Sequence, residues 1–252
     1  MGIHVHKTGI NKTAGQQSDG IVTSDLLGNW IPGTGVNAHY WENGVDQADG
    51  GFNLRRFNTV ATGSSPNHWI FSGTNDYFGS AETGYGGQPF FIDTSSAFTL
   101  AQWFKNDSGV AHVAFSLVYS NSNIAKLIIS QSGETANKAH LSVGANTPVE
   151  FGHTFADDTW YYISLVYAGS NVWSFFVNGS FVGSSTISTS GVNPAELQIG
   201  RDAATSTYSG GTIKLGHVHV HSAALKNSQL RQNMLASHDV KDARIYGATY
   251  TA

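Results

Sequence analysis

The sequence predicts an all-β fold: a two-sheet antiparallel jelly-roll β-sandwich with one short C-terminal helix and an N-terminal arm. Short runs of alternating apolar residues recur along the chain, and clusters of Gly, Ser, Thr and Asn separate them. The alternation is typical of strands that bury one face, and the clusters are typical of turns. With 252 residues, of which 40% are hydrophobic, the chain is long and apolar enough for one large sandwich.

Strands are expected where apolar side chains recur at every second position. The expected strands are Phe98–Lys105, Val110–Tyr119, Ala125–Gln131, His140–Ala145, Trp160–Ala168, Val172–Val177, Ser180–Thr186, Glu196–Gly200 and Leu215–His221. A hairpin is expected over residues 170–185, because Asn178 and Gly179 supply the two positive-φ residues of a type I′ turn.

The two ends of the chain differ from this pattern. Leu230 and Met234 recur at i, i+4 within residues 225–239, which predicts a helix that Asn227 or Ser228 caps. Residues 1–19 are polar and lack aromatic side chains, so we expect an N-terminal arm or edge strand that makes an assembly contact. The jelly-roll domain is then expected over residues 20–252.

The composition excludes several classes of function. Only 12% of the residues are charged, and no basic run accompanies the formal net charge of −4, so nucleic-acid binding is not expected. The sequence has no cysteine, which excludes disulfides and thiolate metal sites. Neither an N-terminal apolar h-region nor a run of about 20 apolar residues is present, so we expect no secretory signal and no membrane helix.

Five segments, taken in order, resemble the laminin-G-like, concanavalin A-like lectin-glucanase jelly-roll family. They are residues 69–80, with a Gly-x-Asn-Asp-aromatic turn; 98–105; 157–184, with an aromatic-Val-Asn-Gly hairpin tip; 196–202, with Leu-x-Ile-Gly; and 215–237, with the closing helix. The resemblance implies a concanavalin A-like sandwich and an inward Trp103 in the second segment.

A looser resemblance concerns residues 20–44, which are similar to the lead-in of such domains in bacteriophage virion proteins. It implies a non-enzymatic virion structural protein, a capsid decoration or tail fibre component, that displays a lectin-like jelly roll and binds glycans. The expected partners are other virion proteins of capsid or tail, further copies in a homo-oligomer, and host-surface or environmental polysaccharide. The expected location is the virion, after synthesis in the host cytoplasm.

Two alternatives stay open: a stand-alone calcium-dependent carbohydrate-binding module and a glycoside hydrolase. Retaining glycosidases need two carboxyls about 5 to 5.5 Å apart. No glutamate in this sequence is followed by a second carboxylate at the strand spacing that would place it so, and no Gly-x-Ser-x-Gly elbow is present. We therefore expect no catalytic residues and no enzymatic activity.

Calcium is the one cofactor that the family resemblance suggests, although none is required. The candidate ligands are Asn75 and Asp76, in the turn after the first family strand, and Asp202, just past Leu-x-Ile-Gly. Calcium takes six to eight oxygens, and these side chains supply few. The simpler interpretation is that Asp76 caps a turn.

Histidine is the most unusual feature of the sequence. His217, His219 and His221 alternate with valines, so all three share one face of a strand, where they form a candidate transition-metal site. A polar, solvated sheet face without metal is the simpler alternative.

Aromatic side chains fall into two expected groups. Rings in loops or at strand ends are candidates to stack on the CH faces of sugars. These candidates are Tyr40, Trp41, Tyr77, Tyr85 and Tyr208. Rings inside the strands, such as Trp160, Tyr162, Trp173 and Phe175, are expected to be buried.

Overall fold

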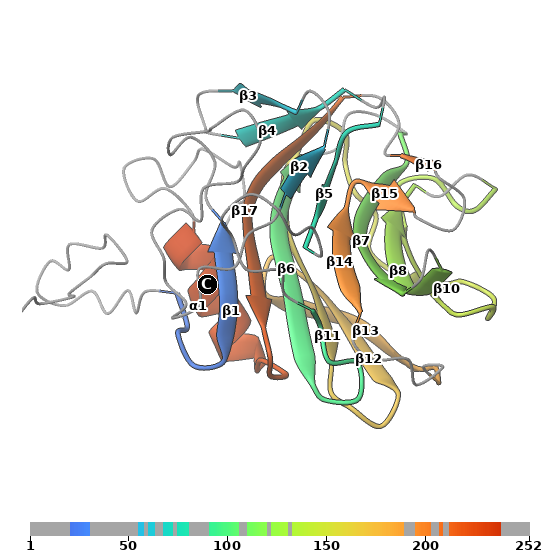
Figure 1. The fold of residues 1–252 in the computed structure, drawn as a ribbon, viewed down its shortest axis with the longest axis vertical. Helices are drawn as coiled ribbons and strands as arrows, with labels where there is room; N and C mark the ends of the chain where they lie inside the picture. Colours follow the sequence, from blue (N-terminus) through green and yellow to red (C-terminus); the bar gives the residue numbers. More distant parts are fainter. Residues whose placement is uncertain are drawn as a thin grey trace, which may run out of the picture.

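The computed structural model describes residues 21–30, 55–57, 60–63, 68–72, 75–80, 91–105, 110–119, 122–130, 133–188, 195–202, 207–208 and 212–237. Within these ranges the fold is two antiparallel sheets that face each other, with one helix on the outside (Figure 1). The predicted all-β sandwich with a short C-terminal helix is confirmed. The expected arm at residues 1–19 lies outside the described residues.

The first sheet has eight strands. Its order is β13 (Ser180–Thr186), β12 (Val172–Val177), β11 (Trp160–Tyr167), β6 (Phe98–Lys105), β17 (Ile213–His221), β4 (His68–Phe71) and β3 (Ala61–Gly63), and β1 (Leu26–Trp30) also pairs with β17. Non-consecutive strands lie side by side in this sheet, as a jelly roll requires.

The second sheet has seven strands. Its order is β10 (Val149–Phe151), β9 (Ala139–Val143), β8 (Ser122–Ile129), β7 (His112–Tyr119), β14 (Glu196–Ile199), β5 (Tyr77–Gly79) and β2 (Arg55–Phe57). A two-stranded ribbon of β15 (Arg201–Asp202) and β16 (Thr207–Tyr208) continues from β14. Gly200, at φ 91°, separates β14 from β15.

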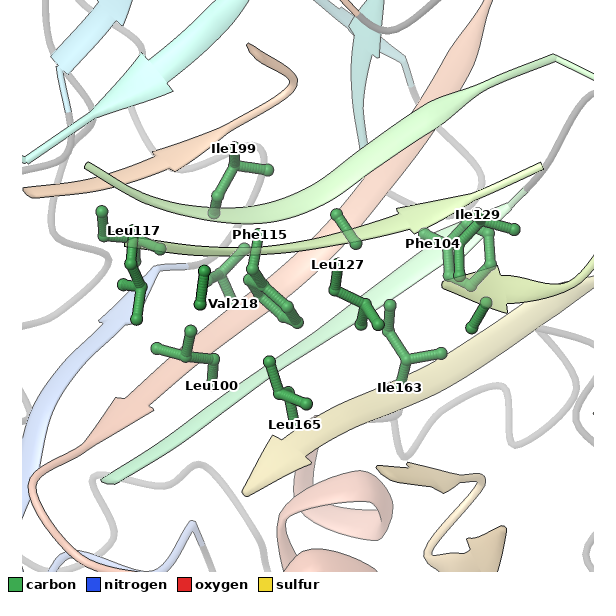
Figure 2. Close-up of a cluster of buried hydrophobic side chains, with 14 of the residues drawn as sticks. Leu100, Phe104, Phe115, Leu117, Leu127, Ile129, Ile163, Leu165, Ile199 and Val218 are labelled. Carbon is green, nitrogen blue, oxygen red and sulfur yellow. The ribbon is translucent and has the colours of Figure 1, made fainter. Parts of the chain in front are cut away.

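The core lies between the two sheets. Phe115, Leu117 and Leu127 of the seven-stranded sheet point toward Leu100 and Leu165 of the eight-stranded sheet (Figure 2), and all five side chains are buried. Fully burying a side chain of this size contributes roughly 1.5–3 kcal/mol. Because successive residues of a strand face opposite ways, the residues between these core positions point outward.

The predicted hairpin is confirmed. Asn178 and Gly179 have φ values of 50° and 70°, and Val177 pairs with Ser180 across the turn. Positive φ at both central residues is the condition for a type I′ turn, which matches the twist of the flanking strands.

Trp103 does not point into the core between the sheets, as the family resemblance implied. It lies on the outer face of the eight-stranded sheet, where its Nε1 donates a hydrogen bond to Ser237 Oγ at 2.8 Å and its ring packs near Met234. Both of these partners belong to α1 (Asn227–Ser237), which lies against β1 and β17 (Figure 1). Trp103 is therefore buried under the helix.

The helix also begins differently from expectation. Lys226, not Asn227 or Ser228, takes the capping position, because its carbonyl accepts hydrogen bonds from the backbone amides of Gln229 and Leu230. The Gln229 side chain accepts from the Lys226 backbone amide at 2.9 Å. A glutamine that reaches back to the cap is half of a capping box. None of the described helices is long and apolar enough to cross a membrane.

Candidate functional site

The outward face of the seven-stranded sheet carries a group of polar side chains, some buried and some partly exposed. Leu197 and Ile199 of β14 point into the core, so Glu196 and Gln198, which alternate with them, point outward. Gln198 Nε2 donates to Glu196 Oε1 at 3.0 Å, which holds the two side chains together. The strand thus presents one carboxylate and one carboxamide on the same face.

Outward residues of three neighbouring strands line up with Gln198. The register pairs Gln198 with Ser116 of β7, Ser116 with Lys126 of β8, and Lys126 with Ser142 of β9. We call these four residues the polar row. It carries hydroxyl, ammonium and carboxamide groups, but Ser116, Gln198 and Ser142 are buried and Lys126 is 18% exposed.

Lys126 is fixed at the middle of the polar row by Asp202 of β15. Its Nζ lies 2.6 Å from Asp202 Oδ2, and the two side chains are 18% and 5% exposed. A short, largely desolvated ion pair of this kind is costly to break from one side, because the remaining charge would be buried without its partner. Asp202 therefore serves to position Lys126.

Tyr77 and Arg201 lie where β5 and β15 meet this face. The Arg201 guanidinium carbon lies 4.9 Å from the centre of the Tyr77 ring, and Arg201 Nη1 donates to Tyr77 Oη at 3.3 Å. Both side chains are partly exposed. The sequence singled out Tyr77 as a candidate sugar-stacking ring but not Arg201, because nothing local in the sequence brings position 201 to position 77.

Two exposed rings at the other end of β14 also escaped the sequence analysis. Phe91 is 44% exposed and Tyr119 is 47% exposed. Phe91 precedes Ile92, which bridges to Ala195, and Tyr119 follows Val118, which pairs with Glu196. Both positions read in the sequence as strand-end aromatics, and only their measured exposure distinguishes them from core rings.

The structure does not describe the side chains of the other four candidate sugar-binding rings. Tyr40, Trp41 and Tyr85 lie outside the described ranges. The backbone of Tyr208 pairs with Arg201 in the β15–β16 ribbon, beside Tyr77, but its side chain is not described. Their assignment to a glycan site stays a prediction.

The candidate calcium ligands all have other surroundings in this structure. Asp76 is buried and accepts hydrogen bonds from the backbone amide and hydroxyl of Ser72, at 2.8 and 2.6 Å, which is how a turn-capping aspartate behaves. Asn75 is exposed, at φ 65°. Asp202 has the Lys126 ammonium where a cation would sit. These side chains fit calcium poorly, and calcium binding stays an untested prediction.

The three histidines of β17 share one face, as the alternation predicted, but that face is not solvated. His219 and His221 are fully buried under α1. Tyr162 Oη lies 3.1 Å from His219 Nδ1, and Asn233 Nδ2 lies 3.0 Å from His221 Nε2. We call His219, His221, Tyr162 and Asn233 the histidine layer. In the described stretches, no three His, Asp or Glu side chains gather closely enough to hold a metal ion.

Burial controls the protonation of the histidine layer. It lowers the pKa of His221 to about 4, against a smaller upward effect of the Ser24 carbonyl. It also lowers the pKa of His219 well below the ordinary value, and the neighbouring His217 and His221 act in the same direction. Both rings are therefore neutral at neutral pH, and His221 holds the helix through its hydrogen bond with Asn233, whereas His219 bonds to Tyr162 of β11.

Comparison with known proteins identifies the family of the chain and solved structures of similar fold. Residues 72–231 match the Laminin_G_3 family model, described as the concanavalin A-like lectin/glucanases superfamily. A search of curated proteins finds no match to the sequence.

Two groups of solved structures are similar in fold. Trypanosoma rangeli sialidase in complex with the inhibitor DANA aligns with a TM-score of 0.62 at 15% identity, over 85% of this chain and 33% of the sialidase chain. The binding domain of botulinum neurotoxin DC, in complex with rat synaptotagmin II, aligns with a TM-score of 0.62 at 10% identity, over 86% of this chain and 53% of that chain. The chain thus spans a third to a half of the proteins it resembles.

The expectation of a virion structural protein, as capsid decoration or tail fibre, is wrong. The similar structures named above are a sialidase and a neurotoxin binding domain, not virion proteins, and the matched family model describes lectins and glucanases. The phage-like lead-in at residues 20–44 misled the prediction, because it is a short, glycine-rich segment of low specificity. Nothing in the structure or the comparisons bears on the expected location.

Proposed function

Because the chain belongs to the Laminin_G_3 family of the concanavalin A-like lectin/glucanases superfamily, we propose that it is a carbohydrate-binding domain. Its ligand lies on the outward face of the seven-stranded sheet and is held without being cleaved. The observation that carries the proposal is the partly exposed Tyr77–Arg201 pair, with the partly exposed Glu196 carboxylate on the same sheet.

A sugar needs two kinds of contact at once. Its CH faces pack on aromatic rings, and its hydroxyl groups both donate and accept hydrogen bonds. Tyr77 supplies a partly exposed ring, which Arg201 holds in place, and the partly exposed Arg201 and Glu196 supply a hydrogen-bond donor and an acceptor beside the largely buried polar row. The low charge of the chain, with 12% charged residues, agrees with a neutral, hydrogen-bonding ligand.

Binding without cleavage is supported by the residues of β14. A retaining glycosidase places two carboxyls about 5 to 5.5 Å apart across the scissile bond. Glu196 shares its face of β14 with Gln198, a carboxamide that is neither acid nor nucleophile. The nearby carboxylate of Asp202 is buried against the Lys126 ammonium, so it is not poised for proton transfer.

A protein ligand is the second candidate, and one neurotoxin binding domain of similar fold is recorded in complex with rat synaptotagmin II. Protein interfaces usually bury a contiguous apolar centre. The exposed large hydrophobic side chains of the described residues are Phe91, Tyr119, Phe181 and Leu235, which come from different elements. A sugar therefore fits this face better than a protein.

The proposal is tested by screening the purified chain against a glycan array and measuring each hit by calorimetry. We expect Tyr77→Ala and Gln198→Ala to weaken binding at least tenfold, a loss of about 1.4 kcal/mol. Phe181→Ala is the matched control, because it removes a more exposed ring from β13 in the other sheet.

Three results would overturn the proposal. They are an array without hits, full affinity in both site variants, and loss of affinity in the Phe181→Ala control alone. Release of reducing ends from a bound glycan by the wild-type chain would instead establish a hydrolase and remove the claim of binding without cleavage.

A further inference from the structure

We infer that a second copy of this chain pairs with β13 at the edge of the eight-stranded sheet, so that the two copies form one continuous sheet across a two-fold axis. Among the described strands, β13 is the last in the order of that sheet and pairs with β12. Four of its seven residues are exposed. This edge belongs to the other sheet from the candidate sugar site, and pairing along it does not depend on whether the chain binds sugar.

β13 differs from the other described edges because it lacks the features that prevent strand pairing. Natural proteins protect sheet edges with short strands, charged side chains, proline or burial. β3 has three residues, β1 is largely buried, and β2 and β10 have three residues each and carry Arg55, Arg56 and Glu150. β13 has seven residues and contains neither a charge nor a proline. Its edge is therefore open to another strand.

The backbone of β13 has groups that point away from β12. The Ile187 amide donates to the Asn171 carbonyl at 2.9 Å, so this pair is hydrogen-bonded. Hydrogen-bonded and non-hydrogen-bonded pairs alternate along an antiparallel ladder, and the register is regular from here back to Gly183. Thr186 and Ser184 therefore belong to non-bonded pairs, and their N–H and C=O groups point outward. No described residue hydrogen-bonds to these groups.

The free end of the strand is clear of its neighbours. The bulge in β13 falls between Phe181 and Gly183, at the hairpin end. Helix α1 also reaches this hairpin, where Arg231 lies against Gly179. Both features lie on the hairpin side of the free backbone groups, so they do not obstruct a strand that pairs with those groups.

A second copy supplies an edge that matches this one. An axis through Ser185 places Ser184 of one copy opposite Thr186 of the other, and each of these two symmetric pairs exchanges two backbone hydrogen bonds. Opposed serine and threonine side chains pair favourably, and no like charges face each other. So short a pairing buries less than the about 1,200 Å² that stable complexes need, so association is weak and depends on concentration.

The test is sedimentation of the whole chain at concentrations from micromolar to millimolar. For the wild type we expect the mass to rise from 26.9 kDa toward twice that value. Ser184→Pro removes an outward N–H, so this variant should dimerise at least tenfold more weakly, a change of about 1.4 kcal/mol. Ser184→Ala keeps the N–H and should dimerise like the wild type.

A charged variant tests the same edge without proline. Ser184→Lys combined with Thr186→Lys places lysines opposite each other across the axis, and this double variant should stay monomeric. Ser174→Lys is the matched control, because Ser174 pairs with Ser184 on β12, one strand away from the edge. It should dimerise like the wild type, and thermal melting should verify that every variant is folded.

Amide hydrogen exchange provides a second readout. In the wild type, exchange at Ser184 and Thr186 should slow as the concentration rises, whereas exchange at Ser185, whose N–H faces β12, should not change.

Three results would refute the pairing of copies along β13. They are a monomeric mass up to millimolar concentration, a dimer that persists in both the proline and the double lysine variants, and a dimer that the Ser174→Lys control abolishes. None of them bears on the proposed function, which the glycan array tests separately.

Discussion

Acidification should destabilise the domain steeply between pH 7 and pH 5, because buried histidines must stay neutral in the folded state. Burial lowers the pKa of His221 to about 4 and that of His112, which lies in the core against Phe104, to about 3. In the unfolded chain both return to 6.5, the ordinary value for histidine. The unfolded state therefore binds more protons throughout this range.

The magnitude follows from these values. A histidine whose folded pKa is depressed stabilises the fold fully above pH 6.5, and the contribution is lost as the pH falls toward the folded pKa. Integrated from pH 7 to pH 5, each of the two histidines accounts for about 2 kcal/mol, or about 4 kcal/mol together. Since a domain is stable by roughly 5–15 kcal/mol in total, this loss brings it close to unfolding.

The assay is urea denaturation at a series of pH values from 8 to 5, with unfolding monitored by tryptophan fluorescence. His221→Gln and His112→Gln should each remove about 2 kcal/mol of the pH dependence, because glutamine can hydrogen-bond but does not titrate. His153→Gln is the comparison, since His153 is only partly buried. A loss below about 1 kcal/mol between pH 7 and pH 5, or equal slopes in all variants, would refute the claim that these rings are buried and neutral.

Three further outcomes are expected. Asn233→Ala removes the hydrogen-bond partner of His221 and of the Val22 amide, so the free energy of unfolding in urea should fall by about 1–3 kcal/mol. An unchanged urea midpoint would show that these hydrogen bonds do not stabilise the fold. Phe115→Ala should cost about 3–5 kcal/mol by leaving a cavity between the sheets, whereas a cost below 1 kcal/mol would place Phe115 outside the core. The melting temperature should be the same in calcium chloride as in EDTA, because the Asp202 carboxylate is already paired with the Lys126 ammonium. A higher melting temperature of the wild type in calcium would contradict this and support a calcium site.

The sequence predicted the strands best where both faces are buried or where a turn is chemically unambiguous. Phe98–Lys105, Val172–Val177 and Ser180–Thr186 have the predicted bounds, and the Asn178–Gly179 turn is where its chemistry requires. The short strands β1 to β3 were not predicted, and β4 and β5 were expected only through the family resemblance of residues 69–80. They have five residues or fewer, which is too few for a period of two to stand out.

The sequence could not say which face of a strand is covered. Alternation places His219 and His221 opposite the valines of β17, and it cannot show that α1 then covers them. The same limit applies to Trp103, which is buried on the outer face instead of the inner one. Burial on the second face depends on where a helix docks, and that is set by contacts far apart in sequence.

The candidate site was predicted only in part for the same reason. Tyr77 could be singled out because it follows a turn, whereas Arg201 and Lys126 become functional candidates only through pairing with distant residues. Phe91 and Tyr119 look like core aromatics in the sequence, and only the ends of the strands expose them.

The most direct test of the central claim is to map the bound glycan by amide chemical shifts, using an array hit and the isotope-labelled chain. We expect the largest shifts along β14 and its neighbours β5, β7 and β15, around Tyr77, Arg201 and Glu196. Shifts confined to α1 and the eight-stranded sheet would contradict the account, because they would put the ligand on the opposite side of the sandwich.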